Sequence, residues 1–272
     1  CRARARQGCY NRAVSSSIIA IGDELLSGFT LDTNSHWLSE RLRLLGFPVK
    51  RRTTVQDRNR DIAEQVQRDL ADPELEAIFC SGGLGPTPDD RTLEAIAETL
   101  DRELVEVPEI TLKIERRVAQ LVESGVVRSA QVTEGNRRMA FVPAGYERVL
   151  KNSYGMAPGL CYRVDQHLLF ILPGVPPELK GIFTEEIEPR YLSGRPGAVV
   201  QEMRFRFAVE ARFYPVMREL ETTHPDVSVG SYPNSETREL TIRALGQDPD
   251  RVADALDVVR RRVAEMGLQP LD

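Results

Sequence analysis

The chain has 272 residues and a formal net charge of −5, with 41% hydrophobic and 28% charged residues. This composition is ordinary for a globular protein with a sizeable core, and the negative charge argues against a broad surface for nucleic acid. No run approaches the roughly 18 apolar residues of a membrane-spanning helix. The four cysteines form no CxxC pair and the three histidines share no ligand spacing, which argues against a disulfide framework or a histidine-based metal site. We expect a cytoplasmic protein that binds neither membranes nor nucleic acid.

Residues 1–16 are predicted to form a disordered extension that carries four arginines. A basic arm or a targeting segment is the alternative interpretation, but no apolar signal-peptide core follows these arginines. The first apolar run that predicts a strand begins only after this extension.

The next part of the chain alternates between predicted strands and predicted helices. Short apolar runs indicate two buried strands, a stretch with basic residues at alternate positions indicates a third strand between them, and apolar residues spaced three and four apart indicate helices. The strands are expected at 17–21, 49–55 and 75–80, and the helices at 33–45, 58–71 and 91–100. This alternation predicts an α/β domain of three layers, with a mostly parallel sheet between helices and ligands at the carboxyl ends of the strands.

The same domain is predicted to continue to about residue 192. In chain order we expect a helix over 108–125, mixed short elements over 130–150, a glycine- and proline-rich loop over 152–159 and a buried strand over 168–172. This strand leads through Pro173 and Gly174 into another helix. It therefore forms a second strand–loop–helix junction like the one after the strand at 75–80.

The pattern changes at a linker over 193–197. Beyond it, Met203, Phe205, Phe207 and Val209 alternate with charged or small residues, which predicts a half-buried strand. A helix, two further alternating strands and an amphipathic helix complete a β-α-β-β-α unit. The predicted organisation is an extension over 1–16, a main domain over 17–195 and a small α+β domain over 200–272.

The most informative motif is Ser81–Thr92, which reads SGGLGPTPDDRT. Its glycines allow the backbone to pass close to a ligand, and a helix N-terminus after such a loop favours phosphate. Asp89 and Asp90 put negative charge where that anion is expected. A divalent metal between the carboxylates and a phosphate would resolve the conflict. The alternative is a plain turn in which Asp90 caps the following helix.

Six motifs of the sequence occur in the order known from one protein family. They are Ile18-Ile-Ala-Ile-Gly-Asp-Glu-Leu-Leu26 with Gly28, Thr33-Asn34, Gly82-Gly-Leu-Gly-Pro-Thr87 with Asp89-Asp90 and Thr92, Asn136-Arg137, Asn152 with Gly155 and Ala157-Pro-Gly159, and Leu172-Pro-Gly174 with Pro177-Glu178. In these motifs the chain resembles the N-terminal module of the competence/damage-inducible (CinA) family, which is built on the MoaB/Mog molybdopterin-binding fold. The tail over 200–266 resembles, in element order, the small domain that follows this module in many relatives.

Two residues depart from the family pattern. Met156 stands where relatives commonly have a small hydroxyl residue, and Val175 stands where a proline is common. Both departures concern the expected substrate contacts rather than the fold. The resemblance does not extend to the C-terminal domain of full-length members, which deamidates nicotinamide mononucleotide, so that activity is not expected here.

The resemblance implies a pocket for a nucleotide or pterin phosphate, a divalent metal (Mg²⁺, Mn²⁺ or Co²⁺) together with potassium, and a homo-oligomer. The implied catalytic residues are Asp57 and Asp90, and the implied metal ligands are Glu24, Asp89 and Asp90. The implied substrate-binding residues are Gly22, Asn34, Gly82, Gly83, Gly85, Asn152, Ser153, Gly155, Pro173 and Gly174. By residue type alone, Asp57 could equally cap the helix over 58–71, and Asn34 could simply start the helix over 33–45.

Three functions are compatible with these motifs. The first is a metal-dependent pyrophosphohydrolase that acts on ADP-ribose or a related dinucleotide. The second is a pterin-binding enzyme of molybdenum cofactor synthesis, and the third is a non-catalytic nucleotide-binding module. All three need the same cradle for phosphate and metal, and the motifs are most similar to the first branch.

Overall fold

A computed structural model describes residues 15–126, 129 and 131–271. It divides into two compact units: the chain up to Leu42 with Phe47–Ser193, and Arg43–Gly46 with the chain from Gly194 onward. The arginine-containing segment that was expected to be an extension lies, up to residue 14, outside the described residues. None of the helices in the described part of the chain combines the length and apolar composition that crossing a membrane requires.

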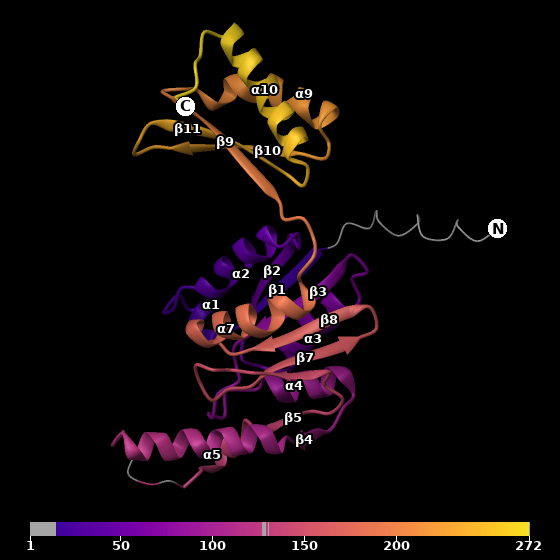
Figure 1. The fold of residues 1–272 in the computed structure, drawn as a ribbon, viewed down its shortest axis with the longest axis vertical. Coiled ribbons are helices and arrows are strands. Elements are labelled where there is room, and N and C mark those ends of the chain that lie inside the picture. Colours follow the sequence, from indigo (N-terminus) through magenta and orange to yellow (C-terminus); the bar gives the residue numbers. More distant parts are fainter. Residues whose placement is uncertain (1–14, 127–128, 130, 272) are drawn as a thin grey trace, which may run out of the picture. The chain divides into compact units, whose positions relative to one another are not determined.

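The first unit is built around a six-stranded sheet in the order β2-β1-β3-β8-β7-β6 (Figure 1). Its strands are β1 (Ser15–Ile21), β2 (Val49–Val55), β3 (Leu75–Ser81), β6 (Arg148–Leu150), β7 (Gly159–Val164) and β8 (His167–Leu172). The four strands β2, β1, β3 and β8 pair in parallel, whereas β7 pairs antiparallel with both of its neighbours, β8 and β6. The predicted mostly parallel α/β sheet is confirmed, and its parallel strands end at one edge.

β1 begins two residues before the predicted strand. The hydroxyl of Ser15 donates to the carbonyl of Glu74 at 2.7 Å, and that of Ser16 donates to the carbonyl of Phe47 at 3.2 Å. These polar side chains are satisfied by the backbone of neighbouring segments, so they can be buried in a strand. Their polarity is the reason that an apolar run alone misses them.

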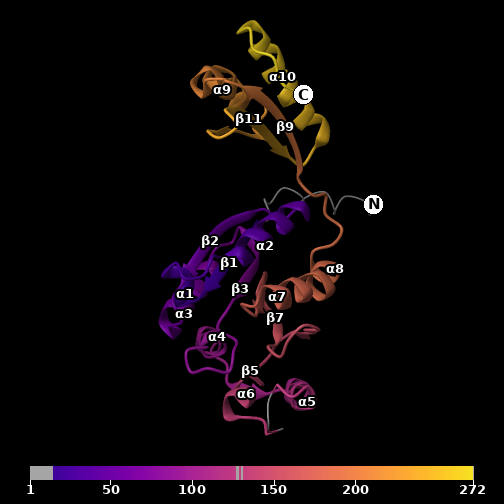
Figure 2. The same ribbon diagram turned by 90° about the vertical axis from the view of Figure 1, so that its left-hand side faces the viewer.

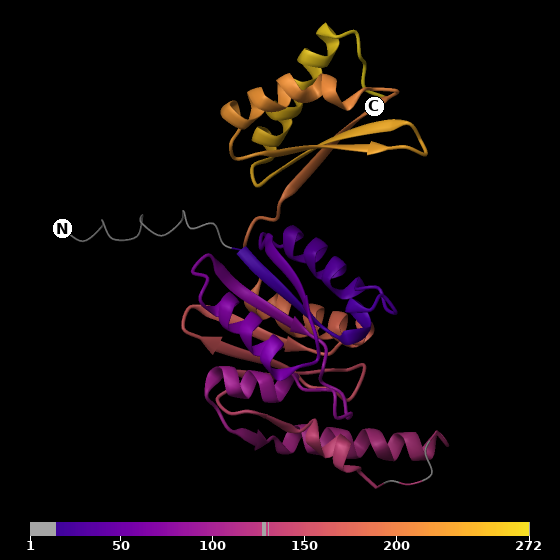
Figure 3. The same cartoon turned by 180° about the vertical axis from the view of Figure 1, so that it is seen from behind.

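Helices cover both faces of the sheet and give the predicted three layers (Figure 2). The helices of the first unit are α1 (Asp23–Leu26), α2 (Thr33–Leu44), α3 (Asn59–Leu70), α4 (Thr92–Leu100), α5 (Pro108–Glu123), α6 (Glu134–Arg138), α7 (Pro176–Ile182), which continues through a π-helical segment (Phe183–Ile187), and α8 (Glu188–Tyr191). On one face, Trp37 of α2 packs edge-on against Phe183, and Phe183 contacts Phe79 of β3, with ring centroids 5.4 and 5.9 Å apart. On the other face lie Ile62 of α3 and Ile96 of α4, on the side seen in Figure 3.

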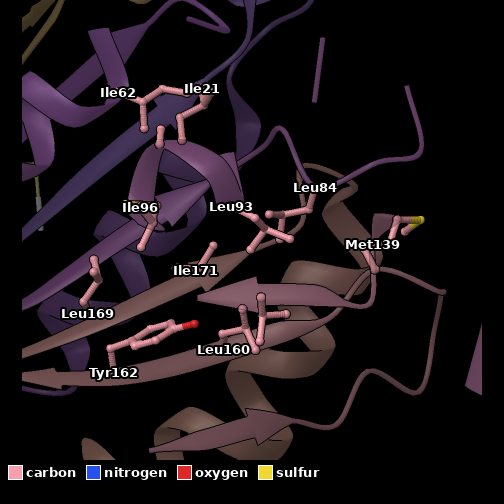
Figure 4. Packing of buried hydrophobic residues seen from close by; sticks show 14 of the residues in the cluster. Ile21, Ile62, Leu84, Leu93, Ile96, Met139, Leu160, Tyr162, Leu169 and Ile171 are labelled. Carbon is pink, nitrogen blue, oxygen red and sulfur yellow. The ribbon is translucent and has the colours of Figure 1, made fainter. Parts of the chain in front are cut away.

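The core on the α3 and α4 side extends from the sheet to the loop that follows β3 (Figure 4). Leu84 of that loop is buried in the same cluster as Met139, which follows α6. The cluster also contains Tyr162 of β7, whose hydroxyl donates to the carbonyl of Pro143 at 2.7 Å. Pro143 belongs to a two-stranded antiparallel ladder of β4 (Leu104–Glu106) and β5 (Phe141–Pro143). The loop is therefore anchored to the core on its apolar side.

β7 has no counterpart among the predicted elements. It pairs with β8 as a hairpin, and the turn between them contains Asp165 at φ 50°. A glycine usually marks such a left-handed position, and its absence removes the local signal for a hairpin.

The second unit is a three-stranded antiparallel sheet, in the order β10-β11-β9, with two long helices. Its elements are β9 (Val199–Arg206), a 3₁₀ helix (Glu210–Phe213), α9 (Tyr214–Thr223), β10 (Ser228–Asn234), β11 (Glu239–Gly246) and α10 (Pro249–Glu265). The predicted extension of the first strand through Phe207 and Val209 is wrong. Phe207 has a φ of 55°, which ends the strand, and its side chain is 68% exposed.

Candidate functional site

A cavity of about 490 Å³ opens at the carboxyl ends of the parallel strands. Its walls are the segments that follow these strands and the first residues of α2 and α7. The predicted site residues that line it are Gly22, Glu24, Asn34, Asp57, Gly82, Gly83, Gly85, Asp89, Asp90, Pro173 and Gly174. Parallel pairing thus brings together segments that lie far apart in the sequence.

Gly82 is the point at which three strand ends meet. Its N–H donates to the carbonyl of Leu172 at 3.1 Å, at the end of β8. Its φ is 117°, and a Cβ there would lie 2.1 Å from the carbonyl oxygen of Ile21, at the end of β1. Both the backbone conformation and the close approach require glycine at this position.

The loop after Gly82 presents backbone donors. Gly83 has a φ of 64°, and the loop returns to α4 through the hydroxyl of Thr92, which donates to the carbonyl of Gly82 at 2.8 Å. The N–H groups of Gly83, Leu84 and Gly85 donate to no acceptor among the described residues. Consecutive free N–H groups at a left-handed glycine form a concave site for anions.

Asp57 lies directly after β2, and its carboxylate accepts a hydrogen bond from the backbone N–H of Asp23 at 2.9 Å. It does not act as the N-cap of α3, because the N-cap residue is Arg58. Partial burial raises the pKa of the Asp57 carboxyl above its ordinary value. The Asp23 hydrogen bond opposes this shift, and the negative charges of Glu24, Asp23 and Asp89 add to it.

Asp90 closes a turn within the glycine loop. Its Oδ2 accepts hydrogen bonds from the backbone N–H of Thr87 at 2.8 Å and from the Thr87 hydroxyl at 2.5 Å. A Cβ at Gly85 would lie 2.6 Å from the same oxygen, so glycine leaves the room that this carboxylate occupies. Asp90 is not the N-cap of α4 either, because that position is held by Arg91.

Asn34 lies in the first turn of α2, and only 9% of it is exposed. Its Nδ2 donates to the carbonyl of Gly174 at 2.7 Å and to the hydroxyl oxygen of Ser81 at 3.3 Å. Because a carbonyl can only accept, the Gly174 contact fixes the orientation of the amide. The Oδ1 atom is buried without a hydrogen-bond partner among the described residues, so an unsatisfied acceptor belongs to a residue of the cavity wall.

The cavity lining is strongly acidic. Its carboxylates are Glu24, Asp32, Asp57, Asp89, Asp90 and Glu178, and no lysine, arginine or histidine is found among the described residues that line it. Hydrogen bonding to Thr87 and the nearby charges of Arg138 and Arg91 lower the pKa of the Asp89 carboxyl, which keeps it ionised at neutral pH. An anion entering this cavity meets a wall whose charged side chains, among the described residues, are all acidic.

The donor set of the cavity fits a divalent cation that is shared with a ligand. Carboxylate oxygens are the donors that hard cations prefer. In the described part of the chain, no three His, Cys, Asp or Glu side chains are grouped closely enough to hold an ion by themselves. A cation would therefore be held by one or two carboxylates and completed by phosphate and water, which is the usual arrangement for Mg²⁺ beside nucleotides.

Three predicted substrate-binding residues, Asn152, Ser153 and Gly155, do not line the cavity. Asn152 donates from Nδ2 to Oε2 of Glu178 at 2.5 Å, and the hydroxyl of Ser153 donates to Glu185 at 3.0 Å. A Cβ at Gly155 would lie 2.0 Å from the carboxyl carbon of Glu178. Asn152 and Gly155 thus contact the side chain of Glu178 in α7. Glu178, and none of the three predicted residues, lines the cavity.

Several cavity residues are absent from the predicted site. They include Leu31, Asp32, Met139, Met156, Val175 and Glu178, so both departures from the family pattern lie in the cavity wall. Asp32 carries a local signal, since its Oδ1 accepts from the N–H of Ser35 at 2.8 Å as a helix cap does. Lys113 of α5 does not line the cavity, and no local pattern in the sequence singles it out. Burial lowers its pKa to about 8, and the nearby charge of Glu178 opposes that shift.

Comparisons with known proteins agree with this geometry. The family described as "Probable molybdopterin binding domain" matches residues 17–193. A protein of Aeropyrum pernix is 36% identical over 261 residues, which cover 92% of this chain and 94% of that protein. A protein of Metallosphaera sedula is 34% identical over 259 residues, which cover 92% of each.

Among solved structures, the protein CinA of Thermoplasma acidophilum, whose function is stated to be unknown, matches with a TM-score of 0.57 at 30% identity. The match covers 66% of this chain and 98% of that chain. The family match spans the sheet of the first unit except for the first two residues of β1, and it includes every residue that lines the cavity. The chain therefore belongs to the family described as "Probable molybdopterin binding domain".

Proposed function

We propose that this chain is a divalent-cation-dependent hydrolase that cleaves the pyrophosphate bond of ADP-ribose or a related dinucleotide. One observation carries the proposal: the cavity is lined both by Gly83 and Gly85, whose backbone N–H groups have no acceptor among the described residues, and by six acidic residues. The N–H groups favour phosphate, whereas the carboxylates repel it unless a cation intervenes. A pyrophosphate bound with a divalent cation satisfies both.

The residues of the chain divide the remaining work. The N–H groups of Gly83 and Gly85 are free to donate to phosphate oxygens, and the carboxylates of Asp89 and Asp90 would hold the cation. A bound divalent cation supplies neutralisation of phosphate charge and a more acidic water. Asp57, whose raised pKa suits it to accept a proton, would orient the attacking water.

The reaction is a hydrolysis of the pyrophosphate bond. The water oxygen would bond to one phosphorus as its bond to the bridging oxygen breaks, the bridging oxygen would leave with the other phosphate, and one water proton would pass to the Asp57 carboxylate. With ADP-ribose as substrate, the products are AMP and ribose 5-phosphate.

The Asp90→Asn variant tests the proposal. We expect it to lower the release of AMP from ADP-ribose by roughly 10²- to 10⁴-fold, because the cation and the turn both depend on this carboxylate. The assay uses purified protein with Mg²⁺, Mn²⁺ or Co²⁺, with and without potassium. The matched control is Asp101→Asn, at the exposed far end of α4, where the left-handed backbone at φ 50° is one that asparagine tolerates. Absence of turnover across a panel of dinucleotides with every cation would refute hydrolysis.

The family match favours a second candidate, a pterin-binding enzyme of molybdenum cofactor synthesis. The matching family is described as a "Probable molybdopterin binding domain" and covers residues 17–193. Tight binding of molybdopterin together with its ATP-dependent adenylylation would support this candidate. Binding of ADP-ribose without cation dependence and without product would instead support a non-catalytic module.

A further inference from the structure

The short helix α6 contacts the glycine loop at two points. A Cβ at Gly135 would lie 2.4 Å from the carbonyl oxygen of Pro86, so glycine allows the two backbones to touch. Thr133 caps the helix by accepting a hydrogen bond from the N–H of Asn136 at 3.2 Å. Five residues are too few for a helix that is stable by itself, so its contacts with the loop determine where it lies.

The second contact is made by the guanidinium of Arg138. Its Nη1 donates to the carbonyl of Thr87 at 2.6 Å, and its Nη2 donates to the carbonyl of Asp90 at 2.7 Å. These residues are the two ends of one turn, since the N–H of Asp90 donates to the carbonyl of Thr87 at 3.1 Å. A single side chain therefore bridges both ends of the turn that carries Asp89 and Asp90.

The guanidinium is itself held in place. Its Nε and Nη2 donate to Oε1 of Glu94 at 3.2 and 2.7 Å, and both side chains are 31% exposed. A planar fork can reach two carbonyls and a carboxylate together, whereas a lysine ammonium is a single point of charge. The arrangement depends on arginine and not merely on positive charge.

We propose that Arg138 is a positioning residue of the site, which sets the carboxylates of Asp89 and Asp90 through the turn that it bridges. It does not line the cavity, so it acts through the loop and not on a ligand. The proposal rests on the proposed function wherever hydrolytic activity is measured. Measurements of the loop and of its Mn²⁺ affinity test the positioning role without requiring hydrolysis.

The first experiment compares Arg138→Ala and Arg138→Lys with wild type, using Mn²⁺ alone as the probe. We expect Arg138→Ala to weaken Mn²⁺ binding by roughly 10- to 100-fold and Arg138→Lys to weaken it less, as is usual when a partner of a metal ligand is lost. Amide hydrogen exchange over Thr87–Asp90 should accelerate in the metal-free variants. The matched control is Arg137→Ala, which removes the exposed neighbouring arginine and should change neither quantity.

The second experiment asks whether the lost group can be replaced. Added guanidinium should restore part of the Mn²⁺ affinity of Arg138→Ala, and part of its hydrolytic activity, because it can occupy the bridge between the two carbonyls. A loss caused by general damage to the fold would not be rescued in this way.

Wild-type Mn²⁺ affinity and wild-type amide exchange in Arg138→Ala would overturn the proposal, and so would equal losses in Arg137→Ala. If wild type itself neither binds Mn²⁺ nor hydrolyses a dinucleotide, the proposed function fails. In that case, faster exchange over Thr87–Asp90 in Arg138→Ala still supports the positioning role, and unchanged exchange refutes it.

Discussion

Asp57 is a site residue whose ionised carboxylate lowers the free energy of unfolding of the metal-free protein. Its pKa is raised because partial burial and neighbouring carboxylates disfavour the ionised form. A group whose pKa is higher in the folded state contributes its stabilisation below the unfolded pKa, and this contribution is lost as the pH rises through the folded pKa. At neutral pH the ionised Asp57 therefore destabilises the metal-free protein.

Asp57→Asn should consequently raise the melting temperature of the metal-free protein at pH 7. We expect a gain of at most about 2–4 °C, the shift that 1 kcal/mol produces in a domain of this size. The gain should disappear as the pH is lowered through the pKa of the carboxyl, because the wild-type side chain then becomes neutral as well. Calorimetry in the presence of a chelator measures both effects. An equal gain at pH 3 and pH 7 would show that charge is not the cause.

Asn34 and Asp57 show which parts of the site can be read from residues alone. Asp57 directly follows a predicted strand, so its place at the sheet edge follows from the fold class. The amide of Asn34 is oriented by a carbonyl 140 positions away in the chain, and no local pattern contains that contact. For the same reason Glu178 and Arg138, which act across separate segments, were not among the predicted site residues.

At the scale of elements, the strand–loop–helix junction after β3 depends on Gly82. The position combines a φ of 117° with a close approach of its Cα to the carbonyl of Ile21. Gly125 has a φ of 74°, but a Cβ there would meet nothing within 4 Å. Substitution of Gly125 therefore measures the free-energy cost of the backbone conformation alone. Substitution of Gly82 measures that cost together with the cost of a steric clash.

We expect Gly125→Ala to cost roughly 1–2 kcal/mol of unfolding free energy, the penalty for a left-handed alanine. Gly82→Ala should cost more, because the strand ends must also separate. Denaturant unfolding measures both values, and equal costs would contradict the role given to the β1–β3 contact.

The same scale explains which elements were predicted. Three of the parallel strands and their helices were recovered because each has its own apolar pattern, whereas β2 was recovered from the alternation of its basic residues. The hairpin of β7 was missed because Asp165 takes the place of a glycine in its turn, and β9 was drawn too long because Phe207 is apolar yet exposed. In both cases the backbone conformation of one residue, which the apolar pattern does not report, decided the outcome.

At the scale of the whole molecule, every residue that lines the cavity belongs to the first compact unit. We therefore expect a chain shortened after Ser193 to bind Mn²⁺ with an affinity within about threefold of the full chain. Titration of both proteins checks this, with circular dichroism to show that the shortened chain is folded. Loss of binding by a folded, shortened chain would mean that the second unit contributes to the site.

The homo-oligomer implied by the family resemblance stays a prediction, and sedimentation of both proteins tests it.

Under the proposed function, the carboxylates that line the cavity also determine whether a phosphate ligand enters as a free anion or as a cation complex. A free polyphosphate and the cavity repel each other, whereas its cation complex carries less negative charge and enters more easily. The fraction of protein that has bound ligand would then depend on the concentration of the cation complex and not on the total concentration of ligand. Dissolved salt screens the repulsion, so higher ionic strength should favour entry of the free anion, the reverse of its effect on phosphate sites lined with lysine and arginine. Under the proposed function, an acidic cavity of this kind would admit the cation complex of a polyphosphate in preference to the free anion.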